Sequence, residues 1–146
     1  MSNEELTERL LEEICYVIDI LPERVSDDRI KTFLEIEDYY LQEQELDRFA
    51  DKLINIVIKI QCYHKFEMYC GEWYQNIKPQ ELAAMVKETV KSRDGFLNIL
   101  SKDDNMLLTI NGQSLYMSVY NPTLVAIANL SRLATAEGLF FRRAEN

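Results

Sequence analysis

One stretch constrains the fold of this chain more than any other: an unbroken helical repeat of apolar residues between Leu46 and Tyr63. Apolar side chains recur there at spacings of three and four residues, which places them on one face of an α-helix. The repeat comprises Leu46, Phe49, Leu53, Ile56, Ile60 and Tyr63. Further apolar residues widen this face, so we expect a long, well-buried helix that packs against another helix near the N-terminus.

A second pattern predicts a β-hairpin near the other end of the chain. The segments 106–110 and 113–120 flank the dipeptide Asn111-Gly112, which readily adopts the positive φ values of a two-residue type I′ turn. Within the second segment, apolar and polar residues alternate as they do in a half-buried strand. Helical and strand periodicities therefore occur in the same chain.

The N-terminal segment has the spacing of a helix. Ser2 and Glu5 form a capping-box pattern, and apolar residues then recur at four-three-four spacing from Leu10 to Leu21. Pro22 should end this helix. The segment Thr32–Ile36 is compatible with a short strand or with the start of the next helix, and the pattern does not decide between them.

The remaining segments complete an α+β pattern. We expect short strands at 66–70, 96–100 and 139–142, and helices at 79–90 and 123–136. A length of 146 residues suits a single domain, 1–146. The predicted architecture is a small, mostly antiparallel sheet of three to four strands, with an N-terminal helical hairpin and further helices packed on it.

Negative charge is concentrated at the start of the chain. Residues 1–50 hold 15 Asp and Glu against 5 Lys and Arg, whereas the remainder is nearly neutral and the whole chain has a net charge of −9. Such asymmetry argues against nucleic acid as a ligand, since phosphates attract basic surfaces. It favours a basic protein as the partner.

The composition also bears on location. No apolar stretch approaches the roughly 20 residues that a membrane span needs, and the N-terminus lacks the basic and apolar regions of a secretion signal. The three cysteines, an odd number, favour free thiols over a disulfide framework. We therefore expect a cytoplasmic protein that does not bind membranes.

Two groups of residues are candidates for contacting a protein partner, since Tyr and Trp combine apolar area with a polar tip and aromatic faces attract Arg and Lys. The first group places aromatic rings among carboxylates: Glu35, Glu37, Asp38, Tyr39, Tyr40 and Glu43. The second is the pair Trp73 and Tyr74. In size and charge alone, the chain is similar to bacterial immunity and antitoxin proteins, which cover nuclease active sites with acidic faces.

Two alternatives belong to other functional classes. Cys62, His64 and Cys70 carry the donor atoms that zinc prefers, but their spacing matches no known zinc-finger pattern and a fourth ligand is missing, so this group is a weak candidate for a metal site or a thiol nucleophile. No catalytic motif and no cofactor-binding fingerprint is present, so we predict neither an enzyme nor a cofactor. The third class is a homodimer or larger homo-oligomer, formed through the Leu46–Tyr63 repeat or a sheet edge.

Overall fold

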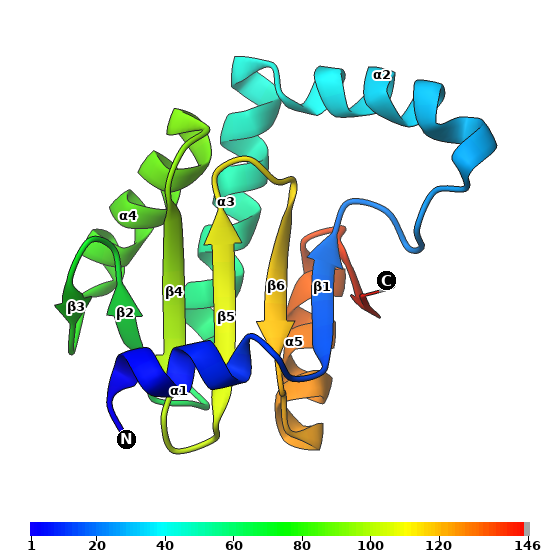
Figure 1. The fold of residues 1–146 in the computed structure, drawn as a ribbon. Coiled ribbons are helices and arrows are strands. Elements are labelled where there is room, and N and C mark those ends of the chain that lie inside the picture. Colours follow the sequence, from blue (N-terminus) through cyan, green and yellow to red (C-terminus); the bar gives the residue numbers. More distant parts are fainter. Residues whose placement is uncertain (145–146) are drawn as a thin grey trace.

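The computed structural model describes residues 1–144 of the chain, which form one antiparallel sheet with helices on both faces (Figure 1). The helical elements are α1 (Asn3–Leu10), the 3₁₀ turn η1 (Asp27–Arg29), α2 (Ile30–Tyr40), α3 (Glu43–Ile60), α4 (Pro79–Ser92) and α5 (Leu124–Ala136). The strands are β1 (Cys15–Asp19), β2 (Glu67–Tyr69), β3 (Trp73–Tyr74), β4 (Phe96–Ser101), β5 (Met106–Asn111), β6 (Tyr116–Tyr120) and β7 (Phe140–Arg143). Within residues 1–144 the sheet has seven strands in the order β3-β2-β4-β5-β6-β1-β7.

The predicted sheet of three to four strands is therefore wrong, although the α+β class holds. The main difference is β1, which lies where the spacing from Leu10 to Leu21 predicts a helix. The segment that forms it, Cys15–Asp19, combines aromatic and β-branched residues that favour strands. It lies between β6 and β7 and pairs with both, so its backbone groups are satisfied on two sides and its Ile18 is fully buried.

The N-terminal helical hairpin is also absent, because α1 ends at Leu10 and α3 packs on the sheet instead. The undecided segment Thr32–Ile36 is helical and forms the middle of α2. The helix predicted from Leu46 onward is confirmed as α3, but it ends at Ile60, and Tyr63 lies beyond it with 64% of its surface exposed.

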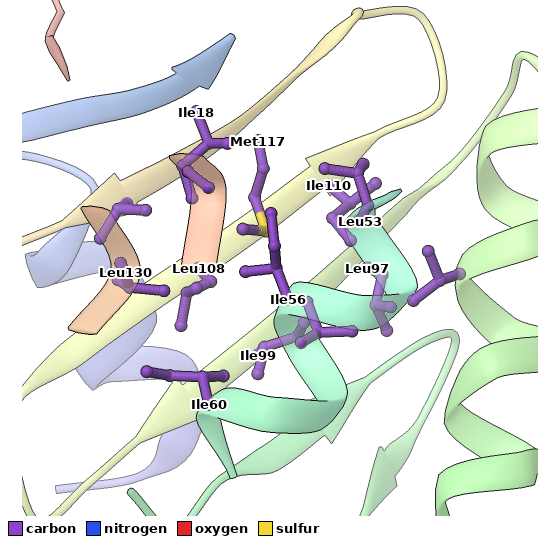
Figure 2. Packing of buried hydrophobic residues seen from close by; sticks show 14 of the residues in the cluster. Ile18, Leu53, Ile56, Ile60, Leu97, Ile99, Leu108, Ile110, Met117 and Leu130 are labelled. Carbon is purple, nitrogen blue, oxygen red and sulfur yellow. The ribbon is translucent and has the colours of Figure 1, made fainter. Parts of the chain in front are cut away.

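The main core lies between the sheet and the layer formed by α3, α4 and α5 (Figure 2). Leu53, Ile56 and Ile60 of α3 are fully buried. They face the strand residues Leu97, Ile99, Leu108, Ile110 and Met117, which alternate with residues on the other face of the sheet. This packing uses the apolar face of α3, so the repeat from Leu46 to Ile60 is not available as an interface between copies.

The opposite face of the sheet is covered only in part. Leu6 and Leu10 of α1 pack on Leu100 and Leu107, and α1 crosses this face near one end of the strands (Figure 1). The remaining length of β6 and β1 has no helix lying on it. Helix α2 extends away from the body to the start of α3, and none of its residues is buried.

The predicted hairpin is confirmed as β5 and β6, but its type I′ turn is wrong. Neither Asn111 nor Gly112 has a positive φ, and the connection extends to Leu115. Glycine is instead required at position 112 because the backbone there lies close to the backbone of Thr89 and Asp94. A Cβ placed on Gly112 would lie 2.5 Å from the carbonyl oxygen of Thr89 and 2.7 Å from both the nitrogen and the oxygen of Asp94.

We expect Gly112→Ala to destabilise the fold by about 1–3 kcal/mol, because backbone atoms must move to admit the methyl group. Urea unfolding followed by circular dichroism measures the change. Gln113→Ala, at an exposed neighbouring position, is the control and should remain within about 0.5 kcal/mol of the wild type. Equal stability of Gly112→Ala and the wild type would contradict the close approach.

Candidate functional site

The predicted acidic and aromatic group lies on α2 and at the first residue of α3. On a helix with 3.6 residues per turn, Glu37 shares a face with Ile30 and Phe33, whereas Glu35 and Tyr39 lie on the opposite side. The Tyr39 side chain is 51% exposed and meets the Tyr40 ring edge-on, with ring centroids 5.1 Å apart. Only Tyr40 packs partly against the core.

The carboxylates of this group form no ion pair within the described residues. Among the ion pairs within residues 1–144, none involves Glu35, Glu37, Asp38 or Glu43. By contrast, three other carboxylates of the acidic segment are paired: Asp19 with Arg142, Glu45 with Arg48, and Asp47 with Lys87 and Lys91. The charge on α2 therefore faces solvent.

The acidic segment does not form one continuous surface. Its carboxylates are spread over α1, which lies on the sheet, the region of η1 and α2, which projects from the body, and the first turns of α3 (Figure 1). The second predicted pair, Trp73 and Tyr74, lies apart from α2, on the edge strand β3. The Trp73 indole N–H donates a 3.0 Å hydrogen bond to Glu4 and so ties α1 to the sheet.

A groove that the sequence did not predict lies between α2, the β1–η1 connection and the uncovered face of β6, β1 and β7. Its volume is about 500 Å³. Apolar side chains supply much of its wall: Ile20, Leu21, Val25, Ile30, Phe33 and Leu115. The strand residues of its floor are Cys15, Val17, Asp19, Tyr116, Ser118, Tyr120 and Arg142.

Strand register brings the floor residues together. Val17 is opposite both Ser118 and Arg142, and in antiparallel pairs opposite residues share a face of the sheet. Residues two apart along each strand share that face as well, which adds Asp19 and Tyr116. One sign of this surface was in the sequence, because two tyrosines occupy the non-core positions of the alternating segment 113–120.

The charges on the floor of the groove balance. Arg142 donates a 2.8 Å hydrogen bond to Asp19, so the two charges there compensate each other. Burial raises the pKa of the Cys15 thiol and that of the Tyr120 hydroxyl, so both groups are neutral at pH 7. Two further carboxylates line the groove: Glu23 in the β1–η1 connection and Glu37 on α2.

The alternative site at Cys62, His64 and Cys70 gains no support from the geometry. Nδ1 of His64 lies 2.6 Å from Oδ2 of Asp104, and the His64 side chain is buried. Cys62 is exposed on the outside, and the three cysteines are free thiols. Across the described part of the chain, no three His, Cys, Asp or Glu side chains gather as a metal site requires.

A small hollow of about 110 Å³ contains the most buried carboxylate, Glu67. Lys102 lies 2.7 Å from its Oε2, and the Gln75 amide donates a 2.7 Å hydrogen bond to its Oε1. The ion pair with Lys102, together with the Gln75 hydrogen bond, lowers the pKa of Glu67 despite its burial. Since Lys102 forms an ion pair with one oxygen and Gln75 donates a hydrogen bond to the other, we assign this carboxylate a structural role.

The lowered pKa predicts how Glu67 contributes to stability. The contribution is present in full above the unfolded-state pKa of about 4.3 and is lost as the pH falls through the lower folded-state value. We expect Glu67→Gln to cost about 1–3 kcal/mol at pH 7 and progressively less as the pH falls below the unfolded-state pKa. Urea unfolding at several pH values measures the difference, and a cost independent of pH would contradict the ion pair.

No match was found for this chain among protein-family models, curated protein sequences or solved structures. None of the helices within residues 1–144 is long and apolar enough to cross a membrane.

Proposed function

We propose that this protein is an acidic protein-binding module, and that α2 is the element with which it recognises a basic partner. The observation that carries the proposal is the exposure of α2: a helix with no buried residue that displays unpaired carboxylates beside aromatic and aliphatic side chains. The exposed apolar residues are Ile30, Leu34, Ile36 and Tyr39. Because α2 buries few apolar side chains within this protein, burying them against another protein would be favourable.

The chemistry of α2 suits a partner rich in Lys and Arg. Carboxylates at Glu35, Glu37 and Asp38 steer a basic surface during encounter, and the open face of Tyr39 accepts a guanidinium. We assign the protein no catalytic role. One partner of this kind is a basic enzyme whose active site α2 covers, as immunity proteins cover nucleases.

We place this interaction in the cytoplasm. Support comes from the free thiols of Cys15, Cys62 and Cys70, which are typical of a reducing compartment.

The double substitution Glu35→Lys and Asp38→Lys tests the proposal, because it reverses charge on α2 without altering a buried side chain. In affinity capture from the source cell with quantitative mass spectrometry, we expect a basic protein to be retained by the wild type and lost by the variant. With the purified partner, the affinity should fall by about tenfold or more, and it should also fall as salt is raised.

The matched control is Glu8→Lys with Glu12→Lys, which makes the same change in net charge on and just after α1, at two exposed positions. It should retain the partner. Equal losses in both variants would show a non-specific charge effect, and full retention by the α2 variant would contradict the proposal. Thermal melts of each variant establish that all are folded.

A further inference from the structure

We infer that the groove between α2 and the sheet binds an amphipathic helix of the partner, with an apolar face against the sheet and Lys or Arg at its margins. The inference rests on the proposed function, because it names the part of the basic partner that this module holds. Three features of the groove support it: the uncovered sheet face, the apolar lining and the charge around the rim.

The first feature is the way the protein covers the rest of the same face. Helix α1 lies across the strands there and buries Leu6 and Leu10 against Leu100 and Leu107, with its acidic residues outward (Figure 1). Beside it, the face of β6 and β1 has the same alternation of side chains but no helix on it. An external helix laid beside α1 would complete this layer.

The second feature is the surface that such a helix would meet. Ile30 and Phe33 of α2 form one wall and Tyr116 lies on the floor; Ile30 is 42% exposed and Tyr116 41%. Val17 and Leu115 also line the groove, but both are already buried, and Leu115 belongs to the main core. The volume, about 500 Å³, lies within the 300–1,000 Å³ that is typical of binding pockets. Because the charges of Asp19 and Arg142 compensate each other, apolar side chains can be buried here without exposing an unpaired charge to them.

The backbone of β1 and β6 favours a helical occupant over an extended one. Strands β1 and β6 are hydrogen-bonded to neighbours on both sides, to β6 and β7 and to β5 and β1 respectively. An extended segment laid on this face would find no free backbone groups to pair with. A helix satisfies its own backbone and presents apolar side chains at spacings of three and four residues.

The third feature is charge. Residues 20–38, which comprise the β1–η1 connection and most of α2 beside the groove, contain six carboxylates and three cations. Glu23 and Glu37 line the groove itself, together with Arg24, and Asp27 and Asp28 lie in the adjoining η1. A complementary helix therefore carries basic residues at its margins. A second copy of this chain is a poor occupant, since its own net charge of −9 opposes the carboxylates beside the groove.

The experiment uses a phage-displayed library of random 16-residue peptides, selected on the full-length protein. We expect the enriched peptides to place apolar residues at helical spacing and Lys or Arg at the flanks. Their affinities are then measured by fluorescence anisotropy against three variants. Ser118→Trp fills the groove, Tyr116→Ala removes a ring from its floor, and Tyr63→Ala removes an exposed ring far from it.

Ser118→Trp should weaken the peptides by about tenfold or more and Tyr116→Ala should also weaken them, whereas Tyr63→Ala should bind like the wild type. Because Tyr116 is 41% exposed, its substitution keeps the test valid if Ser118→Trp fails to fold. Acidic or non-periodic peptides, or no enrichment above background, would overturn the inference. So would peptides that bind Ser118→Trp and Tyr116→Ala as well as they bind the wild type.

Failure of this inference is distinguishable from failure of the proposed function. If the captured partner is lost by Glu35→Lys with Asp38→Lys but kept by Ser118→Trp and Tyr116→Ala, α2 recognises the partner and the groove does not. If light scattering shows a wild-type dimer that Ser118→Trp converts to a monomer, the occupant is a second copy and the inference is wrong.

Discussion

Burial of one face of α3 against the centre of the sheet is the interaction on which the rest of this structure depends. Each fully buried Leu or Ile side chain contributes about 1.5–3 kcal/mol relative to exposure, and α3 supplies three of them, Leu53, Ile56 and Ile60. This packing uses β4, β5 and β6 as its platform, with α4 and α5 beside α3 on the same face. The opposite face of the sheet is then left to the short N-terminal helix α1, which covers only part of it.

The unequal covering of the two faces explains why the molecule has a groove. The chain enters the sheet through β1, a strand hydrogen-bonded on both sides, and must then return to the start of α3 on the other face. It makes this return through η1 and α2, which run outside the body and bury no residue of their own. An acidic, partly apolar helix is thereby placed at the margin of an uncovered sheet face. The proposed recognition of a basic partner by α2 and the proposed binding of the partner's helix in the groove both follow from that placement.

Much of the local structure could be predicted from the sequence, because it depends on patterns within a few residues. The repeat in α3, the strands of the hairpin and the helix α5 all follow such patterns. The structure differs from the prediction where a local pattern is compatible with two kinds of secondary structure. The spacing from Leu10 to Leu21 suits a helix, yet Cys15–Asp19 becomes a strand because β6 and β7 offer it partners. At Gly112 the requirement for glycine comes from the backbone of Thr89 and Asp94, which a turn rule cannot include.

The acidic and aromatic residues from Glu35 to Tyr40 are neighbours in the chain, so their proximity and their net charge follow from the sequence without knowledge of the fold. Their surroundings depend on the fold. They lie on a helix with no buried residue, away from Trp73 and Tyr74 on β3. The groove beside this helix has Val17, Ser118 and Arg142 on its floor. The physical reason is that these floor residues come from three strands distant in sequence. Long-range strand register, set by burial of the opposite face, brings their side chains to one surface.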